Sequence, residues 1–173
     1  NKWISLGVNS SYALTKSDRE DGSFSEFITR TPIAQIYNED GSYSRYINSN
    51  NDVNPFYRAE NYKREISTNS YRLNVFLELK PFKGFNYRLN TSFYNREQED
   101  GEAKGVNYPG GGATAKLTDR EDRSYLIENI FTYNVPIKDQ KHKLTITAVQ
   151  SVDHKQTKQL GYATDQLPVD MDW

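Results

Sequence analysis

The chain has 173 residues, of which 26% are charged and 13% aromatic, and its formal net charge is -1. This balance gives no sign of binding to nucleic acid or acidic lipid through bulk charge. The absence of cysteine excludes a disulfide framework, a zinc site with cysteine ligands and a cysteine nucleophile. Thirteen Tyr and eight Phe against one Met favour strands, because aromatic rings pack well on a pleated surface.

Hydropathy predicts no transmembrane helix, because no run of about 18 apolar residues is present. The first residues, Asn1 to Ser5, also lack the basic-then-apolar order of a signal peptide. We therefore expect the chain to begin inside a longer protein.

The first element expected is a strand from Trp3 to Lys16. Its residues alternate with period two, which places Ile4, Leu6 and Val8 on one side and small polar residues on the other. From Ser17 to about Glu65 the sequence is rich in Asn, Ser, Asp, Gly and Tyr, which predicts a long loop.

A hairpin is expected next, because Ser70 to Pro81 alternates again and is followed by Phe82-Lys83-Gly84. Those three residues predict a short turn in which Gly84 takes the left-handed conformation. A slip of one residue would scatter both faces, so the turn and the alternation predict the same register. That register pairs Leu79 with Tyr87, Leu77 with Leu89, Val75 with Thr91, Leu73 with Phe93 and, on the other face, Glu78 with Arg88.

Three strands and two connections complete the expected order. The third strand runs from Phe85 to Arg96, and a Gly-rich loop from about Glu97 to Arg123 follows it. A fourth strand is expected over Tyr125 to Val135, and a short turn leads to a fifth over Lys143 to Asp153. The last twenty residues are expected to be loop.

The fold class indicated is all-β: a segment of an antiparallel transmembrane β-barrel with about five long strands, long extracellular loops and short periplasmic turns. Strands of about ten to twelve residues are long for a soluble sheet, and about nine to eleven tilted residues cross a hydrocarbon core. The residues expected to face the lumen are Arg72, Glu78, Arg88 and Arg96. Those expected to face lipid are Leu6, Val8, Leu73, Val75, Leu77, Leu89, Phe93 and Ile146.

The alternative is a soluble or surface-attached β-sandwich that serves as a binding or adhesion module. In that fold the apolar face would pack on a second sheet and the charged face would meet water. Long loops count against it, since structureless connections beyond about 15 residues are uncommon in compact domains.

Three segments resemble the SusC/RagA family of TonB-linked outer-membrane transporters. Tyr125 to Tyr133, followed by a short polar turn and His142 to Ser151, is similar to barrel strands of that family. Thr31 to Tyr43 resembles a loop segment in which a proline-containing run precedes a "yn-dGsy" turn, with Asn54-Pro55 after it. Trp3 to Asn9 is similar to a recurring strand opening of the family.

The resemblance implies TonB-dependent import of nutrients such as oligosaccharides or peptides across the outer membrane of a Gram-negative bacterium. It also implies a SusD-type surface lipoprotein and the TonB complex as partners. Residues 1–173 would be part of the barrel domain, without the plug domain. Five strands cannot close such a barrel, so the segment is expected to belong to a larger wall.

No catalytic residue, metal or cofactor is expected, and the chain is not expected to be an enzyme. His142 and His154 read as solvated polar residues, since no cysteine and no ligand spacing accompanies them. Aromatic residues of the first loop and its Arg residues are suited to stacking on sugars and binding hydroxyls, although the same rings would also pack the loop onto its neighbours. The candidates for substrate contact are Tyr57, Arg58 and Tyr108.

Overall fold

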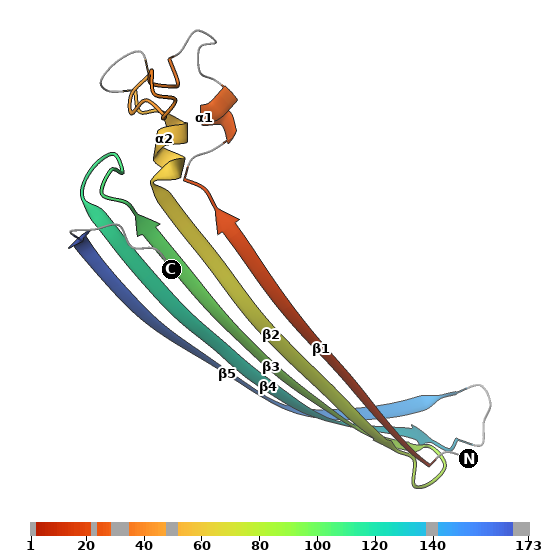
Figure 1. Cartoon of the computed structure of the whole chain (residues 1–173). Coiled ribbons are helices and arrows are strands. Elements are labelled where there is room, and N and C mark those ends of the chain that lie inside the picture. Colours follow the sequence, from red (N-terminus) through yellow and green to blue (C-terminus); the bar gives the residue numbers. More distant parts are fainter. Residues whose placement is uncertain (1–2, 22–23, 29–34, 48–51, 138–141, 168–173) are drawn as a thin grey trace. The chain divides into compact units, whose positions relative to one another are not determined.

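The computed structural model describes residues 3–21, 24–28, 35–47, 52–137 and 142–167. Five strands form one antiparallel sheet, and they lie side by side in chain order, β1-β2-β3-β4-β5 (Figure 1). Two short helices lie in the connection between the first two strands. The elements are β1 (Ile4–Arg19), α1 (Phe24–Ile28), α2 (Pro55–Glu60), β2 (Tyr62–Leu79), β3 (Phe85–Lys104), β4 (Ala113–Val135) and β5 (Leu144–Leu167).

The predicted all-β antiparallel fold is confirmed, but four of the five strands are much longer than predicted. β2 begins at Tyr62 and β3 continues to Lys104. The predicted loop from Glu97 to Arg123 is therefore wrong, since only residues 105–112 separate β3 from β4. The last twenty residues were also expected to be loop, yet β5 continues to Leu167, and residues 168–173 lie outside the described part of the chain.

Polar cross-strand pairs explain why the alternation of apolar and polar residues did not reveal these extensions. Arg64 on β2 donates from Nε and Nη2 to the two carboxylate oxygens of Asp100 on β3, over 2.9 and 2.7 Å. Where both faces are polar, a strand has no period-two hydropathy signal. The backbone ladder nevertheless continues, supported by such pairs.

The chain divides into two compact units. The first comprises Asn1–Leu14, Asn69–Glu97 and Arg120–Lys158, and the second comprises Thr15–Thr68, Gln98–Asp119 and Gln159–Trp173.

In the first unit, side-chain contacts agree with the predicted register of the β2–β3 hairpin. Ser92 Oγ donates to Asn74 Oδ1 over 2.8 Å, and the guanidinium of Arg72 lies 5.1 Å from the ring centre of Tyr94. Gly84 has φ +90°, so its predicted left-handed conformation is confirmed. β2 ends at Leu79, two residues before the predicted end.

At the end of this hairpin the register places Glu78 opposite Arg88, and each of the two side chains also has another partner. Glu78 pairs with Lys80, with 3.2 Å between its carboxylate and Nζ. The guanidinium of Arg88 lies 4.8 Å from the ring centre of Phe76 and donates from Nε to Asn90 Oδ1 over 2.9 Å. Arg88 thus contacts a ring and an amide, and it also interacts electrostatically with Glu78.

Phe76 is an apolar residue on the otherwise polar face of β2, and a glycine on β1 leaves space for its ring. A Cβ added to Gly7 would lie 2.1 Å from the nearest ring carbon of Phe76, well inside van der Waals contact. Gly7 therefore permits this ring to lie against the neighbouring strand.

We expect Gly7→Ala to destabilise the folded protein by about 1–3 kcal/mol, because the ring of Phe76 must move from under Arg88. Chemical denaturation of the intact protein in detergent would measure the change. Gly161→Ala is the matched control, because nothing lies within 4 Å of the added Cβ. The double variant Gly7→Ala/Phe76→Ala should lose less stability than the two single variants lose together, because the added methyl group no longer meets the ring. A loss equal to the sum of the two single losses would contradict the clash.

In the second unit, Asn54 organises the connection between β1 and β2. It is fully buried, and its side chain donates to the carbonyls of Ile36 and Ser44 over 2.9 and 2.7 Å. Its Oδ1 accepts from the backbone N–H of Phe56 over 3.0 Å, which caps α2. We call this arrangement the Asn54 anchor, because a single side chain ties residues 36–44 to the start of the helix.

Candidate functional site

Side chains of alternate residues in the first unit form an apolar face. Two groups of aromatic rings lie on it. In the first group, the ring of Tyr71 is 6.3 Å from that of Phe93, and Tyr125 stacks on His154 at 5.1 Å. The second group comprises Phe82, Phe85, Tyr87, Phe131 and Tyr133, whose neighbouring rings are 4.9–6.4 Å apart.

Aliphatic side chains fill the strand segments between these two aromatic groups. On β2, residues 72–79 follow Tyr71 and carry Leu73, Val75, Leu77 and Leu79 on this face. The separation is shorter on the next two strands, since five residues lie between Tyr87 and Phe93 and five between Tyr125 and Phe131. Aromatic rings thus lie at both ends of the apolar face, as they do on membrane-spanning barrel strands.

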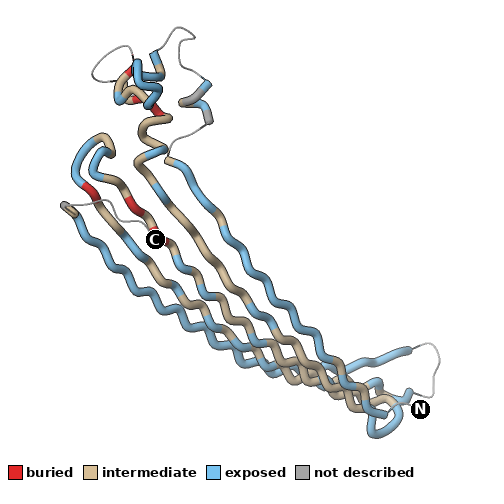
Figure 2. The backbone as a smooth tube through the Cα atoms, viewed as in Figure 1, coloured by how far each residue is buried: buried red, intermediate tan, exposed pale blue. Residues whose placement is uncertain are grey.

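The apolar face has no covering layer among the described residues. Its side chains are most exposed on the edge strands, where Leu6 is 69% and Ile146 is 54% accessible. Figure 2 shows that β1 and β5 are mostly exposed and the three central strands mostly half-buried. Exposed apolar surface of this extent indicates contact with lipid or with another apolar layer.

One polar row crosses the apolar face. Tyr87 Oη donates to Asn129 Oδ1 over 2.7 Å, and Asn129 Nδ2 donates to Gln150 Oε1 over 2.5 Å. The row links β3, β4 and β5. Mutual hydrogen bonds lower the cost of keeping these groups on an apolar surface.

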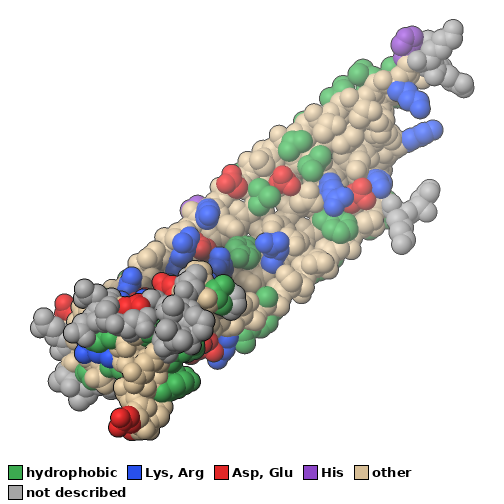
Figure 3. All heavy atoms as spheres, turned by 90° about the horizontal axis from the view of Figure 1, so that it is seen from above, with side chains coloured by type: hydrophobic (Ala, Val, Ile, Leu, Met, Phe, Trp, Pro, Cys, Tyr) green, Lys and Arg blue, Asp and Glu red, His purple; other side chains and the backbone are tan. Residues whose placement is uncertain are grey.

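The opposite face is polar along the same strands. Asn90 Nδ2 donates to Glu128 Oε2 over 3.4 Å, and Thr145 Oγ1 donates to Asn134 Oδ1 over 2.7 Å. Because side chains alternate along a strand, Arg72, Glu78, Arg88 and Arg96 share this polar face. Figure 3 shows one side of the molecule, on which charged side chains lie among apolar ones. That the polar face borders a lumen stays a prediction.

The structure brings two of the three candidates for substrate contact together in the second unit. Arg58 Nε lies 3.4 Å from Asp21 Oδ2, and Arg58 Nη2 bonds to the carboxylate of Glu26. Tyr108 donates its hydroxyl to Asp21. The third, Tyr57, lies in α2, where its backbone carbonyl accepts from Asn61 Nδ2 over 2.8 Å. Sequence reasoning missed Asp21 and Glu26, and no motif marks them.

Burial and the neighbouring Asp21 carboxylate raise the pKa of Tyr108 to about 12. Burial disfavours the phenolate, and the hydrogen bond to Asp21 stabilises the protonated form.

Three aromatic rings of the first connection stack on one another. Tyr37 lies 5.1 Å from Tyr43, and Tyr43 lies 5.5 Å from Phe56, with interplanar angles of 25° and 14°. Phe56 follows the Asn54 anchor, so the stack is fixed to the start of α2. Tyr37 is the outermost ring and is exposed.

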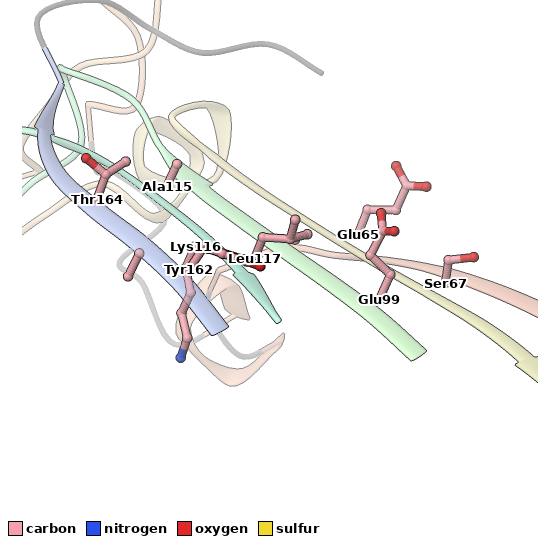
Figure 4. Close-up of a pocket in the computed structure, with 10 residues that line it drawn as sticks. Glu65, Ser67, Glu99, Ala115, Lys116, Leu117, Tyr162 and Thr164 are labelled. Carbon is pink, nitrogen blue, oxygen red and sulfur yellow. The ribbon is translucent and has the colours of Figure 1, made fainter. Parts of the chain in front are cut away.

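A hollow of about 460 Å³ lies over β2 to β5 in the second unit (Figure 4). Small residues, Gly101 and Ala115, line it together with Leu117 and Tyr162. The side chains of Glu65 and Glu99 lie on the same side of the sheet, and the side chain of Lys116 points to the other side (Figure 4). No sequence motif predicted this hollow.

Neither a metal centre nor a membrane-spanning helix is found in the described ranges. They contain no group of three or more His, Asp or Glu side chains that could hold a metal ion. No helix among them is long and apolar enough to cross a membrane.

We expect the phenolate of Tyr108 to form near pH 12 and at lower pH in Asp21→Asn, because the amide removes the negative charge beside the hydroxyl. Rapid pH-jump absorbance spectra would measure this, with Tyr108→Phe subtracted to isolate the one ring. A Tyr108 that titrates near its ordinary value of 10.0 would contradict the partly buried bond to Asp21.

No protein-family model and no curated protein sequence matches the chain. Among solved structures, the chain is similar to one in the "Structure of the RagAB peptide transporter", with a TM-score of 0.73 and 15% sequence identity. The match covers 95% of this chain and 20% of that one. The chain therefore shares its fold with one-fifth of a much longer protein.

Proposed function

We propose that this chain is a wall segment of an outer-membrane β-barrel that imports nutrients in a TonB-dependent manner. In this proposal residues 1–173 belong to the barrel domain of a longer SusC/RagA-like transporter in a Gram-negative bacterium. The observation that carries it is the apolar face of the first unit, where aliphatic side chains lie between two groups of aromatic rings.

The position of those rings at both ends of the apolar face supports a lipid contact. Aromatic residues at both ends of an apolar strand segment are typical of barrels that cross a bilayer. Leu6, Val8, Leu89 and Ile146 would then face lipid with the aliphatic residues of β2, and Phe93 would lie at the boundary. The opposite, polar face would border a water-filled or plug-filled lumen, where Arg72, Arg88 and Arg96 remain hydrated.

Transport is inferred from the shared fold and the family resemblance together. The structure with the shared fold is that of a peptide transporter, and peptides are one of the two nutrient classes that the resemblance implies. A SusD-type lipoprotein and the TonB complex would be the partners. Tyr57, Arg58 and Tyr108 remain candidates for substrate contact, and enzymatic activity is not part of the proposal.

The sandwich alternative finds less support. A sandwich needs a second sheet on the apolar face, and the described residues form a single sheet. No observation specifically favours an adhesion module.

We expect Val75→Arg to reduce strongly the amount of folded protein in the outer membrane, since Val75 lies midway along the apolar segment of β2 and an arginine on the lipid face of a barrel costs about 2–4 kcal/mol near the midplane. Asn74→Arg is the matched control, because it places the same charge one residue along β2 on the polar face. Folded protein would be measured by heat-dependent gel migration of washed outer membranes. Equal tolerance of both variants, or release of the wild type without detergent, would reject a lipid-facing surface.

We also expect import to require the intact protein and TonB together. A strain lacking either should lose growth on the nutrient, supplied as mixed peptides or mixed oligosaccharides, and should keep growth on a small sugar that passes porins. The growth rate on each source is the measurement. If the strain that lacks this protein grows at the wild-type rate on both mixtures, the protein has no role in the import of these nutrients.

A further inference from the structure

Four polar side chains, two of them carboxylates, form one cluster in the second unit. Asp21 follows β1, Glu26 lies in α1, Arg58 lies in α2, and Tyr108 lies in the connection between β3 and β4. Arg58 bonds to Glu26 and forms an ion pair with Asp21, and Tyr108 donates its hydroxyl to Asp21. Three segments that are distant in sequence therefore meet at Asp21.

Arg58 is the only link from this cluster to Glu26 among the described contacts. Its Nη2 bonds to Glu26, and its Nε lies 3.4 Å from Asp21 Oδ2 as an ion pair without a hydrogen bond. One guanidinium charge is thus shared between two carboxylates. Removal of Arg58 would leave two acids and no cation between them.

The cluster is partly solvated, which distinguishes it from the Asn54 anchor. The side chains of Arg58, Asp21 and Glu26 are 24%, 28% and 41% accessible. Ion pairs with this exposure contribute little net stability, because water competes for both partners. Asn54, in contrast, is 0% exposed and its amide has three hydrogen-bonding partners.

Other contacts define which parts of the two connections would remain in place. Gly105 donates its backbone N–H to the carbonyl of Asn61 over 2.9 Å, so the base of the β3–β4 connection is bound to the end of α2. Lys104 Nζ lies 5.0 Å from the ring centre of Tyr108, and Tyr62 lies 6.3 Å from that ring. These contacts hold the ring from one side, and Asp21 holds its hydroxyl.

We propose that Asp21, Glu26, Arg58 and Tyr108 form a releasable latch that fastens α1 and the β3–β4 connection to α2. When the latch opens, α1 and the tip of the connection around Tyr108 are released together, while residues 36–47 stay fixed by the Asn54 anchor. The latch is a conformational device of the chain itself and does not depend on the transport proposal.

Hydrogen–deuterium exchange of the intact protein in detergent tests this coupling. In Arg58→Gln we expect amide exchange in residues 24–28 and 105–112 to become about three- to tenfold faster, with residues 36–47 unchanged. In Asp21→Asn we expect the faster exchange in residues 105–112, because the bond of Glu26 to Arg58 remains. Glu60→Gln is the matched control, because it removes a charge from an exposed position of the same helix. Asn54→Ala should give the converse pattern, with faster exchange in residues 36–47.

Two results would overturn the latch. One is exchange that rises in residues 24–28 and stays unchanged in residues 105–112, because the two segments would then move independently. The other is an equal response to Glu60→Gln, since the effect would then reflect only a loss of charge on α2.

A double-mutant cycle separates the direct bond from a general loosening. Tyr108→Phe removes only the hydroxyl, so adding it to Asp21→Asn should change exchange in residues 105–112 less than it does in the wild type. Fully additive effects of the two substitutions would show that Tyr108 is not held through Asp21 and would reject the latch.

Discussion

Backbone pairing between neighbouring strands is the interaction on which the rest of this chain depends. The described residues form a single sheet, and the buried apolar side chains among them are Ile47, Pro55, Ala103 and Ala113. No interior of packed side chains therefore holds β1 to β5 together. Hydrogen bonds of the ladder and contacts between adjacent side chains on each face must do so, as in a barrel wall.

The two faces of the first unit differ in chemistry because each strand carries two interleaved sets of residues. On β2 the odd positions from Tyr71 to Leu79 are apolar, and the even positions include Arg72, Asn74 and Glu78. The exceptions follow from local contacts. Phe76 lies on the polar face between Gly7 and Arg88, and Asn129 lies on the apolar face bonded to Tyr87 and Gln150.

The second unit is held by polar contacts of two strengths. The Asn54 anchor is buried and has several hydrogen bonds, so it orders the first connection without a hydrophobic interior. The cluster around Asp21 is partly exposed and joins segments that are distant in sequence. Different burial of these two sets of bonds gives the connection one fixed part and one releasable part.

The amino-acid sequence determined the all-β class, the five strands and the β2–β3 hairpin, because period-two alternation and a glycine with positive φ are local signals. It did not reveal the outer halves of the strands, where apolar residues are sparse and pairs such as Arg64 with Asp100 exist only after the strands have met. Only the tertiary structure shows that Arg58 and Tyr108 contact Asp21. It also shows that His154, which was expected at a strand end, lies inside β5 and stacks on Tyr125. These contacts join residues from different elements. Contacts of this kind produce no periodic pattern of residue types in the sequence, so the sequence alone does not predict them.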